Sequence, residues 1–151
     1  MNTTITLLTK AEFKKHLKQH TVIDTYYNTP AGTLWVQSTE LGVFNAAYKV
    51  QEIAHANTAS VLKRIILVGT NFQVKVWQAV LKIPAGATLT YHDIAQTIGK
   101  PRAYRAVANA LAQNKIIFFI PCHRVTKKDG KLGGYAYGID KKLALLTAER
   151  L

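Results

Sequence analysis

The sequence Gly-Lys-Pro at residues 99–101 restricts more than any other feature how the carboxyl half of this chain can fold. Glycine commonly ends a helix and proline is accepted only in a helix's first turn, so one helix must end here and another must begin. Before this break, Thr90 is a candidate amino-terminal cap, and Asp93 completes an imperfect capping box. After it, Pro101 takes a first-turn position in a helix expected over residues 101–114. Two short helices joined by so tight a turn predict a helix-turn-helix.

The second of these helices has two chemically different faces. Helical spacing places five apolar residues on one stripe: Ala103, Ala106, Val107, Ala110 and Leu111. The other face carries Arg102, Arg105, Asn109 and Gln113. Arginine and asparagine can reach phosphates and base edges, and small alanines avoid clashes with the walls of a DNA groove. An ordinary solvated helix face has the same composition, so the pattern alone leaves both interpretations open.

The rest of the chain predicts a mixed arrangement of helices and strands. Residues 72–83 repeat apolar side chains at helical spacing, on Phe72, Val76, Val80 and Ile83. Residues 20–70 are rich in β-branched and aromatic runs, interrupted by TPAG and ELG, which predicts a hairpin or meander. A short helix is expected over residues 11–19, whereas residues 51–69 fit either a helix or a closing strand. We therefore expect an α+β fold of two small domains, residues 1–69 and 70–151.

The charge of the chain is strongly positive and unevenly distributed. The formal net charge is +12, and from residue 72 onward 13 basic residues stand against 4 acidic ones. Such a surface favours a polyanionic partner such as nucleic acid, although an acidic lipid surface or plain solubility would also explain it. No stretch approaches the roughly 18 apolar residues that span a bilayer, and the amino end does not resemble a secretory signal. A single cysteine fits a reducing compartment, so a cytoplasmic location is expected.

That single cysteine follows an apolar run, in IIFFIPCHRV at residues 116–125. A lone cysteine in such a run is usually a small buried apolar residue. Here Pro121 favours a bend, and a helical turn beginning at Cys122 would direct free N–H groups toward a thiolate. His123 and Arg124 would add positive charge, which a thiol with an ordinary pKa near ~8.5 needs to ionise at neutral pH. The local sequence therefore favours a nucleophile.

A base for this thiol follows directly in the sequence. Neighbouring helical residues point about 100 degrees apart, so Cys122 and His123 would not contact each other directly. A water molecule could carry the proton between them, and a carboxylate could orient the other imidazole nitrogen. Of Asp129, Asp140 and Glu149, we select Glu149, which closes the helical stretch KKLALLTAER.

Several segments in order resemble one family. They are GTNFQVKVWQAVLKIPAGATLTYHDIA, IGKPRAYRAVANALAQN, IPCHRV and GGYAYGIDKKLALLTAE, which together lie within residues 69–149. This part of the chain resembles the DNA-binding and active-site domain of the O6-alkylguanine-DNA alkyltransferases, of the Ogt and Ada carboxyl-terminal type. The stretch YYNTPAGTLWVQSTELGVF resembles, more loosely, the family's ribonuclease-H-like amino-terminal domain. The resemblance implies that the carboxyl-terminal domain is helical and winged-helix-like.

The resemblance also implies a reaction. Cys122 would irreversibly accept the alkyl group of O6-alkylguanine in double-stranded DNA, with O4-alkylthymine an open second substrate. The protein would act once, as a monomer and without a metal or organic cofactor. The damaged nucleotide would be flipped out of the duplex, because its O6 atom is hidden in the stack. The helix after Pro101 would enter the minor groove, with Arg105 filling the vacated space.

Individual roles are carried over only onto matching positions. His123 would be the water-relayed base, Glu149 its orienter, Asn114 a support for the turn before the cysteine, and Tyr91 a donor to the leaving guanine. The remaining positions are expected to contact either DNA or the flipped base. DNA contacts are expected from Arg102, Tyr104, Arg105, Ala106 and Asn109. The walls of the base pocket are expected from Ile120, Pro121, Tyr135, Ala136 and Lys142.

A few positions differ from the family's pattern. Many relatives carry glycine or serine where this chain has Ala108, Asn109 and Ala136. Ile117 and Phe118 replace residues that are often smaller or proline, which predicts a narrower pocket and a preference for methyl over bulky adducts.

Three other functions would each explain part of the sequence. An alkyltransferase-like protein that binds the lesion without repairing it would lack the nucleophile, which is present here as Cys122. A plain helix-turn-helix regulator would explain the charge and Arg105, but not the PCHRV segment. A thiol enzyme acting on a small molecule would explain the cysteine, but not the basic half of the chain.

Overall fold

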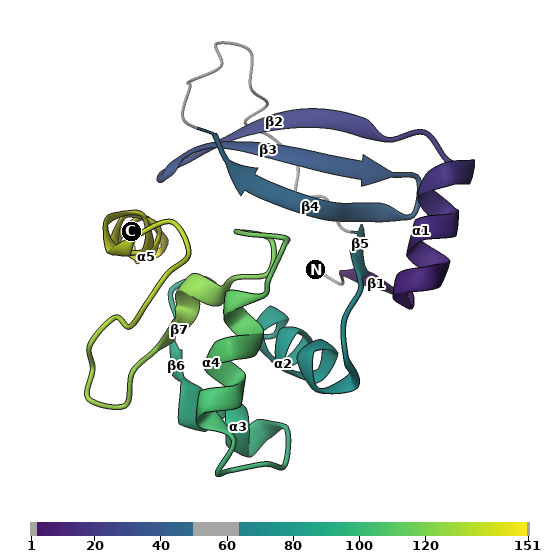
Figure 1. The fold of residues 1–151 in the computed structure, drawn as a ribbon. Coiled ribbons are helices and arrows are strands. Elements are labelled where there is room, and N and C mark those ends of the chain that lie inside the picture. The colour runs from purple at the N-terminus through teal and green to yellow at the C-terminus, as the bar shows by residue number, and fades with distance from the viewer. Residues whose placement is uncertain (1–2, 50–63, 151) are drawn as a thin grey trace.

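A computed structural model describes residues 3–49 and 64–150 of the chain. The amino-terminal part is a five-stranded sheet with the strand order β1-β5-β4-β3-β2, and helix α1 lies at one end of it (Figure 1). Strand β5 pairs in parallel with β1 and β4, whereas β2, β3 and β4 form an antiparallel meander. The bounds are β1 Thr4–Leu7, α1 Lys10–Gln19, β2 Ile23–Thr29, β3 Gly32–Thr39, β4 Gly42–Tyr48 and β5 Arg64–Leu67.

The predicted meander and amino-terminal helix are both present. Strand β3 buries Leu34 and Val36 on alternate positions, as expected for a strand with one face on a core. The turn after β3 ends at Gly42, which has a φ of +142°. A Cβ built there would lie 2.6 Å from the Arg64 carbonyl carbon, which excludes any side chain. For residues 51–69 the sequence did not decide between a helix and a strand. Residues 64–67 of this segment form strand β5, and residues 51–63 lie outside the described part of the chain.

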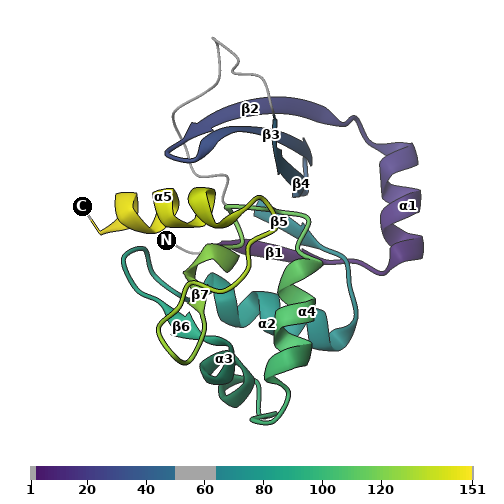
Figure 2. The same ribbon diagram turned by 60° about the vertical axis from the view of Figure 1, so that its left-hand side comes forward.

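The carboxyl-terminal part packs short helices beneath the sheet (Figure 2). A two-stranded parallel pair joins the start of the helix-turn-helix to the segment after the cysteine. The bounds are α2 Asn71–Leu81, β6 Leu89–Thr90, α3 Tyr91–Thr97, α4 Tyr104–Ala112, the 3-10 helix η1 Cys122–Arg124, β7 Val125–Thr126 and α5 Ile139–Glu149. Among the described residues, no helix is both long and apolar enough to cross a bilayer.

The helix-turn-helix is confirmed as α3 and α4, with one change of boundary. Thr90 and Asp93 form a complete capping box, with Thr90 N donating to Asp93 Oδ2 at 2.8 Å and Asp93 N to Thr90 Oγ1 at 3.0 Å. After the end of helix α3, Gly99 turns the chain with a φ of +75°. The expected helix start at Pro101 is wrong, because α4 begins at Tyr104. Residues 100–103 instead form a turn closed by Ala103 N and Lys100 O at 2.9 Å, a geometry in which proline is favoured at the second position.

The buried face of α4 is narrower than its sequence predicts. Val107, Ala110 and Leu111 are buried, as expected, whereas Ala106 is exposed. Ala106 therefore belongs to the outward face together with Arg105.

One continuous core joins the two parts of the chain. Side chains of β3 and β4 pack with those of α2 and α4 and of the segment before the cysteine. That segment also hydrogen-bonds to the sheet, with Ala46 N donating to Lys115 O at 2.8 Å and Ile117 N to Ala46 O at 3.2 Å. The apolar run before Cys122 thus anchors the active-site segment to β4. The boundary between two domains, expected between residues 69 and 70, stays a prediction.

Candidate active site

The cysteine occupies the first position of η1, directly after a sharp bend. Cys122 N donates to Ile120 O at 2.7 Å, and Arg124 N donates to Pro121 O at 2.9 Å, so the chain turns tightly around Pro121. The Cys122 side chain is buried, with 9% of its surface exposed. Burial raises the pKa of its thiol, although a hydrogen bond from Asn114 and the charge of Lys142 oppose this effect. The backbone N–H groups of Cys122 and His123 favour the thiolate, as expected for this turn, but desolvation is the larger effect, so the net shift of the thiol pKa is upward.

Asn114 connects the end of α4 to the cysteine. Its Nδ2 donates to Ile120 O at 3.2 Å and to Cys122 Sγ at 3.5 Å, and Ile116 N donates to its Oδ1 at 2.8 Å. The side chain is buried, so each of these contacts replaces water that the groups would otherwise bind. Asn114 thereby holds the loop between residues 114 and 122 and contacts the sulfur.

His123 is fully buried and pairs with a carboxylate from the last helix. Its Nε2 lies 2.7 Å from Glu149 Oε1, and because a carboxylate only accepts, Nε2 is the donor. The His123 Nδ1 is buried without a hydrogen-bond partner, so its lone pair is free to accept a proton. Burial lowers the pKa of His123, and the Glu149 contact partly offsets this. The imidazole is therefore neutral at pH 7.

Arg124 holds this carboxylate in place, a role that the sequence did not reveal. Its Nε donates to Glu149 Oε2 at 3.0 Å, its Nη2 to Glu149 Oε1 at 2.8 Å, and its Nη1 to Ile83 O at 2.6 Å. These bonds, with that of His123, hold the pKa of Glu149 below its usual value despite the opposing effect of burial. In the sequence Arg124 had only the general role of nearby positive charge, since its partner lies 25 residues away.

A cavity of about 360 Å³ opens at the cysteine. It is enclosed by the end of α4, the first residue of α3 and the loop before α5. Its lining residues are Tyr91, Ala108, Leu111, Ala112, Cys122, Gly134, Tyr135 and Ala136. The wall therefore combines two tyrosine rings with small side chains, which suits a flat aromatic ligand.

The structure brings only part of the expected pocket wall to this cavity. Tyr135 and Ala136 line it, whereas Ile120 and Pro121 are buried behind the bend that places the cysteine. Ile117 and Phe118 are also absent from the wall, so the reason for expecting a narrowed pocket does not hold. Ala108, Leu111 and Ala112 were missed as wall residues because helical periodicity does not show which end of a helix meets a cavity.

Lys142 likewise lies behind the wall rather than on it. The side chain is fully buried, and its Nζ donates to three backbone carbonyls, of Val125, Leu132 and Gly134, at 2.7, 2.5 and 3.2 Å. Burial lowers the pKa of this amine to about 8. Lys142 therefore fixes the path of the loop that carries Gly134 and Tyr135.

The same loop comes very close to the Tyr91 hydroxyl. Gly133 has a φ of +75°, and a Cβ built there would lie 2.9 Å from Tyr91 Oη. Only glycine allows this approach, so the loop packs directly against the tyrosine hydroxyl. Burial raises the pKa of Tyr91, which keeps its hydroxyl protonated and able to donate.

The outward face of α4 presents the side chains expected to contact DNA. Arg102, Arg105, Ala106 and Asn109 are exposed, and Tyr104 is half-buried with its ring stacked on His92 at 4.1 Å. Arg102 lies in the turn before the helix rather than on it. The described residues contain no group of three or more histidine, cysteine or acidic side chains placed to hold a metal ion.

The fold and the site define a class: a helix-turn-helix protein with a buried thiol on the wall of a cavity, followed in the chain by a histidine that is paired with a glutamate. Comparison with solved structures gives the same class. The chain superposes on Mycobacterium tuberculosis OGT in complex with DNA with a TM-score of 0.70 and 33% identity, covering 83% of this chain and 92% of that one. Residues 71–151 match the family described as 6-O-methylguanine DNA methyltransferase, DNA binding domain. The chain belongs to this family.

Two curated relatives show the same similarity, one over most of this chain and one over about half of it. The regulatory protein Ada of Salmonella typhimurium is 42% identical over 132 residues, which is 86% of this chain and 35% of Ada. The methylated-DNA–protein-cysteine methyltransferase of Methanosarcina barkeri is 58% identical over 81 residues, or 54% of this chain and 51% of that protein. The chain thus spans about a third and about half of the length of these two relatives.

Proposed function

We propose that this protein repairs DNA by transferring the alkyl group of O6-alkylguanine to the sulfur of Cys122. The observation that supports this most directly is the position of the thiol on the wall of a cavity that also borders the exposed face of α4. A base flipped from a duplex lying along α4 would enter this cavity between Tyr91 and Tyr135. The names of the relatives, methylated-DNA–protein-cysteine methyltransferases, agree with this reaction.

In the proposed reaction the sulfur attacks the alkyl carbon. The new S–C bond forms as the bond from that carbon to guanine O6 breaks, and the bonding electrons stay on the guanine. The thiol proton passes through a water molecule to the free Nδ1 of His123, whose charge Glu149 stabilises. Tyr91 donates a hydrogen bond to the guanine as its negative charge develops. Because the thioether is stable, each molecule reacts once, and the chemistry needs no cofactor.

In this proposal helix α4 and the turn before it bind the DNA. The small alanines of α4 let the helix approach the minor groove, and Arg102, Tyr104, Ala106 and Asn109 would contact its walls and phosphates. Arg105 would occupy the space that the flipped nucleotide leaves. The protein would act as a monomer in the cytoplasm, and O4-alkylthymine is a second substrate to be assayed in the same way.

Intact mass tests this function. After incubation with an excess of duplex carrying O6-methylguanine, the protein should gain the mass of one methyl group, and peptide mapping should locate it on Cys122. Unmodified duplex and the Cys122→Ala variant are the controls, and neither should gain mass. Binding of the damaged duplex without any mass gain in the wild-type protein would instead support a lesion-binding or regulatory protein.

A further inference from the structure

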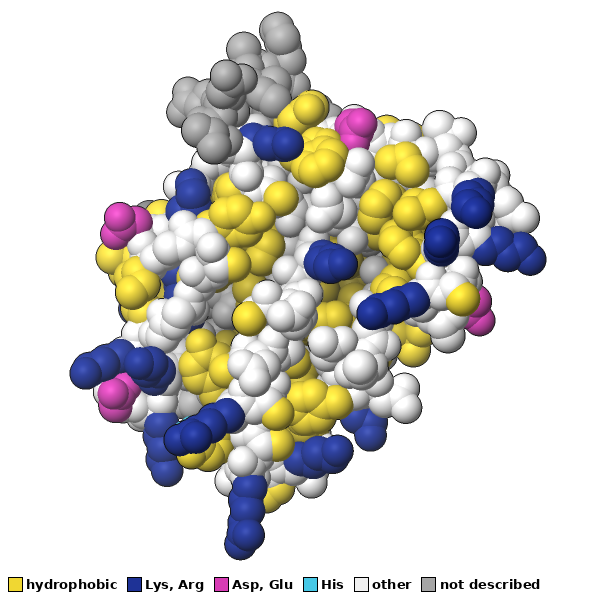
Figure 3. All heavy atoms as spheres, in the orientation of Figure 1, with side chains coloured by type: hydrophobic (Ala, Val, Ile, Leu, Met, Phe, Trp, Pro, Cys, Tyr) yellow, Lys and Arg dark blue, Asp and Glu magenta, His cyan; other side chains and the backbone are white. Residues whose placement is uncertain are grey.

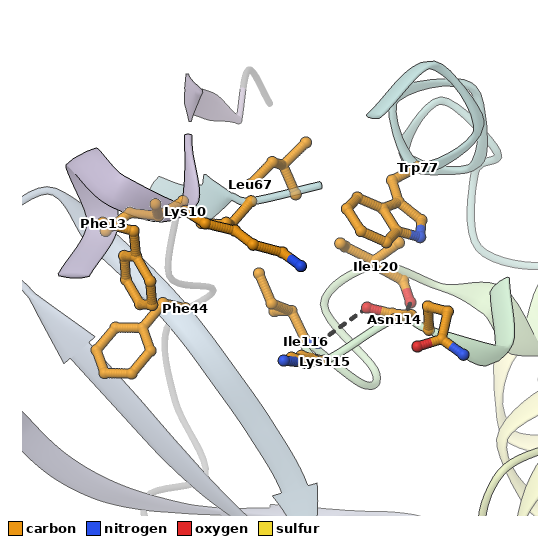
Figure 4. Close-up of a pocket in the computed structure, with 12 residues that line it drawn as sticks. Lys10, Phe13, Phe44, Leu67, Trp77, Asn114, Lys115, Ile116 and Ile120 are labelled. Carbon is orange, nitrogen blue, oxygen red and sulfur yellow. Dashed lines mark hydrogen bonds between the residues drawn. The ribbon is translucent and has the colours of Figure 1, made fainter. Parts of the chain in front are cut away.

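A second cavity, of about 200 Å³, lies between the sheet and the helical part of the molecule (Figure 4). It shares no lining residue with the cavity at Cys122. Its walls come from α1, β4 and β5 on one side and from α2 and the segment after α4 on the other. The residues labelled in Figure 4 are Lys10, Phe13, Phe44, Leu67, Trp77, Asn114, Lys115, Ile116 and Ile120.

The body of this cavity is apolar. Phe13 and Phe44 meet edge to face at 5.2 Å on one side, and Trp77 and Ile120 lie on the opposite side (Figure 4). The Trp77 indole N–H is already used, since it donates to Ala110 O at 2.9 Å. The walls therefore offer aromatic and aliphatic surface to the apolar part of a ligand. A short acyl chain or a single ring would suit such walls.

Two lysines give this cavity a positive charge. Lys10 and Lys115 are both exposed, and Figure 4 shows the Lys10 side chain extending from α1 across the cavity. No acidic residue lines the cavity, and neither lysine forms an ion pair with any residue in the described ranges. Figure 3 shows that lysine or arginine side chains and hydrophobic ones lie close together over α1 on this face. A carboxylate there would meet two ammonium groups and no competing acid.

We propose that this cavity binds a small amphipathic carboxylate, with its apolar part between Phe44 and Trp77 and its head group between Lys10 and Lys115. Such a ligand would contact both parts of the chain at once, so binding would stabilise their packing. It would also contact Asn114, which donates to Cys122 Sγ. The proposed site shares no lining residue with the cavity at Cys122, and the proposal does not depend on the alkyl-transfer reaction.

Octanoate is a suitable probe, and the two tryptophans of the chain supply the measurement. In a ¹H–¹⁵N NMR titration, the indole signal of Trp77 should shift in a saturable manner. The indole signal of Trp35 should not shift, because Trp35 donates to Asp24 on the outer side of the sheet and does not line the cavity. 1-Octanol, which has the same chain but no charge, should bind at least about tenfold more weakly.

Substitution of the lysines tests the head-group site. Lys10→Gln and Lys115→Gln should each weaken octanoate binding by roughly two- to fivefold, the range expected for an exposed charge pair. Lys14→Gln is the matched control, because Lys14 is exposed on the same helix but does not line the cavity, and it should leave the affinity unchanged. An unshifted Trp77 signal, equal binding of octanol, or an equal effect of Lys14→Gln would overturn the proposal.

Discussion

His123 Nε2 and Glu149 Oε1 lie 2.7 Å apart, and this contact joins the segment that carries the thiol to the end of the last helix. Because the carboxylate can only accept, the contact selects the imidazole tautomer whose Nδ1 is free. Cys122 and His123, although adjacent in the chain, need not contact each other. The hydrogen bond to Glu149 orients the ring and leaves the lone pair of Nδ1 unpaired, as the proposed proton relay from the thiol requires.

Glu149→Gln should slow alkyl transfer by about a hundredfold, the lower end of the usual contribution of general acid–base catalysis. The neutral amide cannot stabilise the imidazolium that forms when His123 accepts the proton. Since Glu149 raises the pKa of His123, the acid limb of the rate profile should also move to lower pH. Single-turnover rates across pH measure both effects. Asp140→Asn, at the exposed start of the same helix, is the control, and an equal loss there would contradict a specific role.

Asn114→Ala should destabilise the fold and make the thiol less reactive. The substitution leaves the buried Ile116 N–H without its partner, which costs about 1–3 kcal/mol of unfolding free energy, and removes one of the two hydrogen bonds to Ile120 O. It also removes the hydrogen bond that lowers the pKa of Cys122, so that pKa should rise further. Urea denaturation and the pH dependence of thiol alkylation measure the two effects. Gln113→Ala, at the exposed neighbouring residue, should change neither.

The pH dependence of alkyl transfer should have its acid limb below pH 6.5. The base must be neutral to accept a proton, and burial lowers the pKa of His123 from 6.5, so the rate should hold at pH 6.5 and fall only in more acidic solution. On the alkaline side the rate should not fall near neutrality, because burial raises the pKa of both Cys122 and Tyr91. Single-turnover rates between pH 5 and 9 test this, and a rate already halved at pH 7 would contradict it.

Arg105→Ala should slow repair of duplex DNA much more than reaction with the free base O6-benzylguanine. Arg105 is exposed on α4 and makes no contact with the thiol, so its loss should affect nucleotide flipping and leave the chemistry intact. We expect about a tenfold or greater loss in duplex, since unstacking a base costs a few kcal/mol. Arg150→Ala, at an exposed arginine after α5, controls for the loss of positive charge. Equal slowing of both reactions would exclude the proposed role.

DNA affinity should decrease steeply as salt concentration rises. Lys100, Arg102 and Arg105 are exposed around the start of α4, and three neutralised phosphates predict about a 40-fold loss of affinity between 50 and 200 mM salt. Fluorescence anisotropy with undamaged duplex measures this slope without the repair reaction. A flat response would show that this basic surface does not face the phosphates.

Much of the local structure was predictable because it depends on neighbours in the chain. The capping box of Thr90 and Asp93 and the meander of β2 to β4 follow from short-range spacing, and both are present. The start of α4 was misplaced because proline also favours a turn, and the sequence alone does not decide between the two. The roles proposed for the site residues stay predictions.

What the sequence determined by itself was the family motif, the helix-turn-helix, the meander and the candidacy of Cys122. The tertiary structure decided which side chains meet: Arg124 with Glu149, Asn114 with the sulfur, and Lys142 with three carbonyls behind the pocket wall. It also reversed the expected direction of the thiol's pKa, since burial of Cys122 opposes ionisation more than the turn assists it. The physical reason is that desolvation and long-range contacts depend on how the elements pack, whereas caps, turns and periodicity depend on residues only a few positions apart.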